Sequence, residues 1–203
     1  MKMKFSHLFL ILYVIVFSVC SISPYSRTVW FAENLPILVL VATIILISRH
    51  YQFSNFSILL MGVLPILHTI GGHYTFERVP FGFVTELFGF ERNHYDRIAH
   101  FSVGFYAFPI AEYLLAKRHV TSRELACLFG ILAVFTVASI YEIIEWQYAI
   151  FADPDSGIAV LGSQGDIWDA QKDMLADGLG AILVSIIFYF WAGRKMNIQS
   201  SEQ

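Results

Sequence analysis

Charged residues are scarce in this chain of 203 residues, because Asp, Glu, Lys and Arg together make up only 14% of it. A soluble domain carries roughly 25% of such residues. The low share of charge excludes an ordinary soluble protein. Together with 57% hydrophobic residues, it places the chain in the membrane class.

Basic residues and cysteine are also few. The net charge is −3 and no basic stripe is present, so membrane lipids are expected as partners and nucleic acid is not. Cys20 and Cys127 lie in apolar runs without close spacing. We interpret both as small buried hydrophobic residues.

Known catalytic signatures are missing as well. The sequence contains no H-E-x-x-H motif, no G-x-S-x-G elbow and no Walker loop. Their absence counts against an enzyme, but it leaves the choice between catalysis and binding open.

Long hydrophobic runs are what the chain has instead. A membrane helix needs about 20 mostly apolar residues, so we predict an all-α polytopic membrane bundle of about six transmembrane helices. The first run is expected to be a retained helix rather than a cleaved signal, because it is long and no clean cleavage site follows. The whole chain, 1–203, is expected to form a single integral membrane domain. The expected spans are 5–22, 30–48, 56–70, 97–116, 125–149 and 170–191.

The connection between the third and fourth spans, residues 72–95, is unusually aromatic for a loop. Phe81, Phe83 and Phe88 alternate with charged residues such as Glu86. The segment is too polar to span a bilayer and too apolar to lie free in water. It is therefore predicted to be an interfacial or re-entrant segment that covers a polar pocket.

Basic residues near the span ends indicate the orientation. If the N-terminus is inside, the inner segments hold Lys2, Lys4, Arg49, Lys117, Arg118, Arg123, Arg194 and Lys195. The outer segments then hold Arg27, Arg78, Arg92, Arg97 and Lys172. The bias is eight against five, so both termini are expected in the cytoplasm.

Three polar stretches, 92–100, 141–147 and 165–178, interrupt the apolar pattern. The expected topology brings all three to the outer end of the bundle, where His68 and His73 also lie. Ionisable groups within a membrane cost about 2.5–3.5 kcal/mol on insertion scales, so they usually face the bundle interior and mark a functional site. The convergence therefore predicts a polar pocket that opens outward.

Helical spacing places several of these side chains on common faces. Asp96 and His100 are four residues apart, and Glu142 and Glu145 are three apart. Three aspartates recur every four residues in the sixth span and form an acidic stripe, Asp169, Asp173 and Asp177.

Carboxylates and imidazoles at these spacings are typical of divalent-cation sites and of general acids and bases. The catalytic candidates are Asp96, His100, Glu142, Glu145, Asp173 and Asp177. The candidates for binding a ligand, including a phosphate, are Arg92, Arg97 and His94. The candidate ligands of a divalent metal ion are His68, His73, His100, Asp169, Asp173 and Asp177.

Structural roles compete with these functional ones. Asp166 has the position of a helix N-cap, and Arg92 and Arg97 can anchor the protein to lipid phosphates. Glu142 and Glu145 can hold helices together.

The polar stretches resemble a known family. Residues 68–74, 92–101, 141–146 and 165–174 are similar to the YjdF family of small bacterial inner-membrane proteins of unknown function. The resemblance covers essentially the whole chain and implies the same fold and location.

A weaker resemblance links the second half of the chain to VanZ-like membrane proteins, which are associated with glycopeptide-antibiotic resistance. Residues 96–101 resemble their acidic-basic-x-x-His-Phe helix entry, and Glu142 and Glu145 resemble their glutamate before the loop. Residues 173–181 resemble their Asp-x-x-x-Asn-x-x-Gly-Ala helix, with Asp177 in place of the usual Asn. The resemblance implies a shared fold and an envelope-related role, and it implies no reaction.

Three functions fit these observations. The first is a binding site for a small polar ligand, a metal ion or a lipid head group, with or without chemistry on an envelope lipid. The second is a proton- or ion-coupled carrier, against which the absence of an internal repeat counts. The third is a structural or accessory membrane protein.

Overall fold

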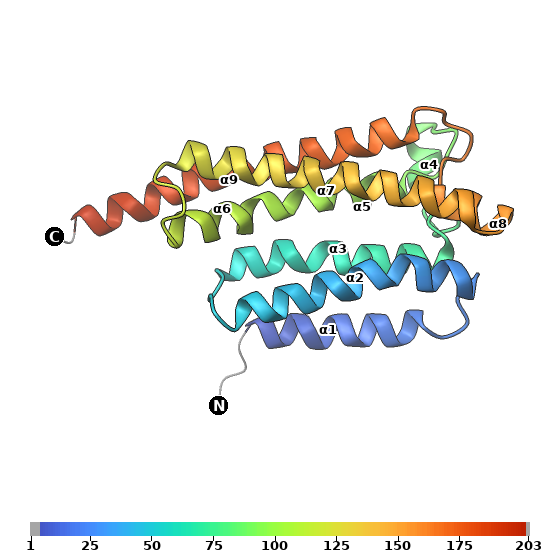
Figure 1. The fold of residues 1–203 in the computed structure, drawn as a ribbon, viewed down its shortest axis with the longest axis horizontal. Helices are drawn as coiled ribbons and strands as arrows, with labels where there is room; N and C mark the ends of the chain where they lie inside the picture. Colours follow the sequence, from blue (N-terminus) through green and yellow to red (C-terminus); the bar gives the residue numbers. More distant parts are fainter. Residues whose placement is uncertain (1–4, 202–203) are drawn as a thin grey trace.

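The computed structural model describes the backbone of residues 5–201 and the side chains of residues 5–193 (Figure 1). Lys2 and Lys4, which contribute to the orientation prediction, lie outside these residues, as do the side chains of Arg194 and Lys195. The described part is helical and contains no strand. Its helices are α1 (Phe5–Cys20), α2 (Arg27–Ser48), α3 (Asn55–Tyr74), α4 (Gly82–Phe88), α5 (Tyr95–Val103), η1 (Gly104–Tyr106), α6 (Ala107–Ala116), α7 (Arg123–Phe151), α8 (Pro154–Leu161) and α9 (Asp169–Ser201).

The prediction of an all-α polytopic membrane bundle is confirmed. Five helical segments are long and apolar enough to cross a membrane: Arg27–Ser48, Asn55–Tyr74, Tyr95–Ala116, Arg123–Phe151 and Asp169–Gly193. The sixth apolar helix, α1, has only 16 residues. It measures about 24 Å at 1.5 Å per residue, which is less than the roughly 30 Å of a hydrocarbon core.

The helices form two groups that lie side by side. One group contains α1, α2 and α3, and the other contains α5, α6, α7 and α9 (Figure 1). We call the end that carries α4 and α8 the α8 end. The opposite end is where α1 begins and α9 ends (Figure 1).

Short polar connections start the spanning helices cleanly. The side chains of Ser26, Ser54 and Ser122 accept hydrogen bonds from the backbone N–H groups three residues later. Each serine thereby satisfies a donor that a helix leaves open in its first turn. The main apolar core lies in the second group, where the ring of Phe108 packs edge-on against Phe188 at a centroid distance of 5.1 Å.

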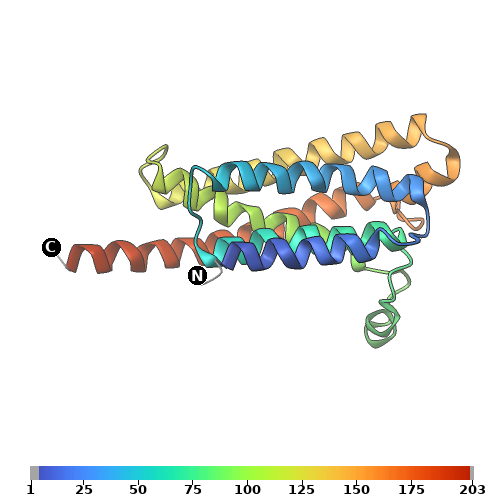
Figure 2. The same cartoon turned by 90° about the horizontal axis from the view of Figure 1, so that it is seen from below.

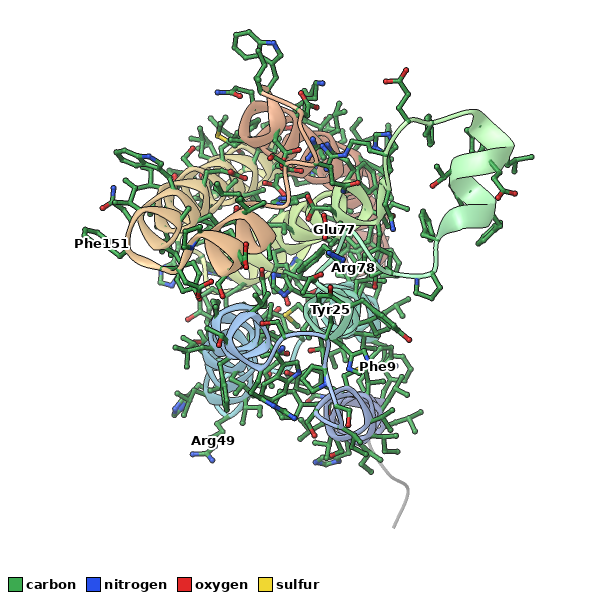
Figure 3. All side chains as sticks on the ribbon, turned by 90° about the vertical axis from the view of Figure 1, so that its right-hand side faces the viewer. Phe9, Tyr25, Arg49, Glu77, Arg78 and Phe151 are labelled. Carbon is green, nitrogen blue, oxygen red and sulfur yellow. The ribbon has the colours of Figure 1, made fainter. Side chains whose placement is uncertain are left out.

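The aromatic connection forms a helix that lies across the bundle axis. In Figure 2 α4 is seen nearly end-on and to one side of the bundle, and in Figure 3 it is seen from its side, clear of the other helices. Its apolar side chains stay open, because Phe83 is 70% exposed and Leu87 is 73% exposed. This geometry is that of an interfacial helix. α4 itself does not line the polar cavity described below, whereas Phe76 of the same connection does.

Candidate functional site

Two glycines position the polar side chains of α5 and α9. A Cβ on Gly180 would clash with the carbonyl oxygen of Phe101 and would lie 3.2 Å from the Cα of Gly104. A Cβ on Gly104 would in turn clash with the backbone of α9. The two backbones therefore touch, as small residues allow in membrane bundles. This contact places the acidic stripe of α9 directly against the polar start of α5.

Arginines hold the outer part of this stripe. The Arg97 guanidinium contacts the carboxylates of both Asp169 and Asp173. Arg92 donates to Asp169 at 2.6 Å and to the carbonyl oxygens of Ser163 and Gly162. These arginines pair with α9 and with the loop before it, rather than standing free as anchors to lipid phosphates.

One turn deeper, His100 lies among three carboxylates. Its Nδ1 is 3.3 Å from Asp177, and its Nε2 is 3.7 Å from both Asp96 and Asp173. One ligand atom each from Asp96, His100 and Asp173 lie within 4.8 Å of one another. Carboxylate and imidazole groups at such separations can coordinate a divalent cation. Of the residues predicted as metal ligands, the structure brings His100 and Asp173 into this triad, and it adds Asp96.

A second polar group lies on α2, α3 and α7. The Nε2 of His68 is 3.7 Å from the Glu33 carboxylate and 3.3 Å from the Tyr141 hydroxyl. Glu33 is only 2% exposed. Sequence reasoning missed Glu33 as a site residue, although an ionisable residue inside an expected span, here 30–48, is itself a signal of a functional site.

A cavity of about 160 Å³ joins the two polar groups. For scale, an engineered cavity of about 150 Å³ holds a benzene molecule. Its polar lining is Glu33, His68, Asp96, His100, Tyr141, Glu145 and Asp177. Its lining at the α8 end is Val160, Leu161 and Gly162. The cavity is therefore covered by α8, which lies between the expected spans 125–149 and 170–191, where no helix was predicted.

Acids outnumber bases at this site. Two guanidinium groups and two imidazoles, those of Arg92, Arg97, His68 and His100, face seven carboxylates. The carboxylates are Glu33, Asp96, Glu142, Glu145, Asp169, Asp173 and Asp177. Even with both imidazoles protonated, the cluster of described residues keeps an excess of negative charge. Buried charge of one sign is costly, so the site calls for bound protons or a bound cation.

Two predicted site residues lie apart from the cavity. His73 donates from Nδ1 to the carbonyl oxygen of Cys20 at 2.8 Å, so it ties the end of α3 to the end of α1. His94 precedes α5, and its ring packs against Phe90 at 4.4 Å. Burial, and then the positive charges of the nearby arginines, lower the pKa of His94. Neither histidine joins the acids, contrary to the prediction for His73 as a metal ligand.

The other candidates occupy the edges of the site. Glu142 Oε1 is buried and has no hydrogen-bond partner among the described residues. Asp166 accepts from the Lys172 ammonium at 2.6 Å and from the backbone N–H of Trp168 at 3.1 Å. The Lys172 hydrogen bond is the main cause of a lowered Asp166 pKa. Asp166 therefore stabilises the loop that leads into α9.

The connections beside the cavity are tied together at the α8 end. Figure 3 looks onto this end, where Tyr25 and Arg78 meet near the centre of the bundle. The guanidinium carbon of Arg78 lies 4.2 Å from the centroid of the Tyr25 ring, and Arg78 also pairs with Glu77 at 2.9 Å. These contacts hold the α1–α2 connection against the segment that follows α3.

Fold and site together define a polytopic membrane protein with an acidic cavity near one end of its bundle. Comparison with known proteins identifies the family to which the chain belongs. Residues 5–194 match the family described as "Predicted membrane protein (DUF2238)", and the chain belongs to this family. It is also 32% identical over 169 residues to the "Inner membrane protein YjdF" of Escherichia coli (strain K12), covering 82% of this chain and 80% of the relative. No solved structure matches the chain.

Proposed function

We propose that this protein binds a polar head group of a membrane lipid in its acidic cavity, with a divalent cation held by Asp96, His100 and Asp173. The observation that supports the proposal is that Asp96 and His100 line the cavity and that Asp173 completes a possible cation site with them. A divalent cation there offsets the excess negative charge. It also gives the cavity an attraction for phosphate oxygens, which its own carboxylates lack.

The cavity supports a head group better than a free ion alone. Its polar lining continues into apolar side chains of α2 and α7, among them Pro36, Leu40 and Val137. A site for a bare ion needs no such apolar extension. A pocket with both kinds of lining fits a ligand that has a polar and an apolar part.

Location and orientation complete the proposal. The family relationship and the apolar helices support a multi-pass protein of the bacterial inner membrane. The bias of basic residues supports cytoplasmic termini, which places the α8 end on the outer side. The ligand would then come from the outer leaflet, which fits an envelope-related role.

The metal content of the purified protein, equilibrated with Mg²⁺, Mn²⁺ or Zn²⁺ and desalted, tests the proposal. We expect about one divalent ion per chain, and its loss in both Asp173→Ala and His100→Ala. Asp155→Asn is the matched control, because Asp155 is an exposed acid at the same end. A well-folded wild-type protein without metal, or metal retained in both variants, would sink the cation site.

An ion-coupled carrier receives less support from the same geometry. A carrier needs polar groups that continue toward the other side of the membrane. Leu64 and Val103 also line the cavity, and both are apolar. Farther from the α8 end lies the apolar core around Phe108. Transport of protons or ions by the protein in sealed vesicles would reverse this preference.

A further inference from the structure

The cavity lies between two helices that do not pack closely against each other. On one side α2 packs against α3 and α8, and on the other α7 packs against α6, α8 and α9. α8 therefore joins the two helices at the end of the bundle and leaves the space between them open farther down. Val137 of α7 both lines the cavity and is 57% exposed. Since this stretch of α7 lies within a spanning helix, the cavity opens sideways into the bilayer.

A carboxylate stands on each helix that borders this opening. Glu33 belongs to α2 and Glu145 to α7, both line the cavity, and they are close enough for their charges to interact. Among residues 5–193, neither forms an ion pair with a Lys or Arg side chain. The nearest polar partners of Glu33 are the neutral Tyr141 hydroxyl at 3.5 Å and His68. The charge of this pair is therefore unbalanced, and the two glutamates line the same cavity as Asp96 and His100 of the proposed cation site.

The aromatic lining narrows the chemistry of the ligand. Phe76 and Tyr141 both line the cavity beside the two glutamates. Aromatic faces attract organic cations, and carboxylates accept hydrogen bonds from N–H donors. His68 is 8% exposed and lines the same wall, and its Nδ1 has no hydrogen-bond partner among the described residues. This part of the cavity can therefore accept a cationic hydrogen-bond donor, and no Lys or Arg side chain among the described residues occupies that place.

We propose that the ligand is an amphiphile that carries a primary ammonium group and enters from the bilayer between α2 and α7. The ammonium binds between Glu33 and Glu145, and the apolar chain extends past Leu40 and Val137 into the membrane. This inference rests on the proposed function and names the class of its ligand. A lipid with an aminoethyl phosphate head group satisfies both sets of residues, because its phosphate reaches the cation triad while its ammonium reaches the glutamates.

Thermal unfolding in a neutral maltoside detergent tests the ammonium site directly. We expect dodecylammonium to raise the melting temperature at concentrations at which dodecyl phosphate, without added metal, does not. Glu33→Gln and Glu145→Gln should each weaken this effect at least tenfold in concentration. Glu86→Gln, an exposed acid on α4, should leave it unchanged. An equal response to dodecyl phosphate, or an unchanged response in both glutamine variants, would overturn the proposal.

Native mass spectrometry with phosphatidylethanolamine and phosphatidylglycerol separates a lipid from a free lipophilic amine. Preference for the ethanolamine lipid that is lost in Glu145→Gln supports a lipid ligand, while binding of dodecylammonium alone identifies a lipophilic amine. Val137→Trp, which narrows the opening from an exposed position, should reduce binding of either ligand without changing metal content.

Metal content of the same samples separates the two proposals. Metal retained without ammonium binding overturns this inference alone, and ammonium binding without metal overturns the cation site alone.

Discussion

Arg97 and Asp173 form an ion pair that joins the start of α5 to the second turn of α9. Their side chains are 14% and 5% exposed, so the pair is largely shielded from solvent. Asp169 shares the same guanidinium. The arginine thus holds two carboxylates of the acidic stripe at once, and this contact fixes where the stripe faces.

Replacing Arg97 is expected to destabilise the protein strongly. Arg97→Met leaves Asp169 and Asp173 without their shared cation, and breaking a buried pair from one side costs about 3–5 kcal/mol. Thermal unfolding in detergent measures this loss. The double variant Arg97→Met with Asp173→Leu should recover part of it, because the second change removes one stranded charge. A double variant no more stable than Arg97→Met would contradict this account.

The backbone contact at Gly180 is expected to tolerate no side chain. Gly180→Ala forces a methyl group against the carbonyl oxygen of Phe101, and overpacking of this kind costs about 1–3 kcal/mol. It should also displace Asp177 from His100 and thereby lower the affinity for the proposed cation, of which His100 is a ligand. Gly82→Ala is the control, since nothing lies within 4 Å of a Cβ there. Equal melting temperatures for the two variants would refute the close-contact argument.

Glu112 is expected to matter for stability and not for ligand binding. At the end of the bundle opposite α8, its carboxylate accepts hydrogen bonds from the backbone N–H and hydroxyl of Ser54, from Ser57 and from Tyr51. Glu112→Ala leaves these donors unpaired at about 1–3 kcal/mol for each that stays buried. Unfolding and metal content are to be measured together, with Glu91→Ala as an exposed control. Loss of metal in folded Glu112→Ala would place this residue in the site.

His94 makes part of the stability depend on pH. Burial and the neighbouring arginines lower its pKa in the folded protein, so the unfolded chain takes up a proton that the folded state resists. This contribution is fully present above the unfolded value of about 6.5 and is lost as the pH falls through the lower folded value. The melting temperatures of wild type and His94→Gln between pH 7.5 and 5 give the measurement. A smaller fall in the variant is expected, and parallel curves would exclude the effect.

The sequence predicted the membrane class and the direction of the acidic stripe, because both depend on local properties. Hydropathy shows which segments avoid water, and a repeat of four places Asp169, Asp173 and Asp177 on one face of any helix. The contact of this face with Arg97 and His100 follows once the polar ends of α5 and α9 are at the same end of the bundle. Predicting that these two polar ends meet requires only the number and order of the membrane spans.

The second polar group of the cavity could not be assigned in this way. The meeting of Glu33 with His68 and Tyr141 depends on the rotation of α2 against α3 and α7, which no local pattern specifies. His73 is five residues from His68, so the two rings lie on different faces of α3, and His73 contacts Cys20 instead of the cavity. The helix α8 was overlooked because eight residues with a proline and a glycine have the composition of a loop.

The crosswise direction of α4 has a mechanical consequence for the whole molecule. A helix bundle in a bilayer can shift along the membrane normal and can tilt, and a short interfacial helix that lies across the bundle axis resists both movements. Sinking would push the charged flanks of α4 into hydrocarbon, and rising would lift Phe83, Leu87 and Phe88 into water. α4 therefore fixes the depth of the bundle in the membrane, and with it the level of the opening proposed between α2 and α7.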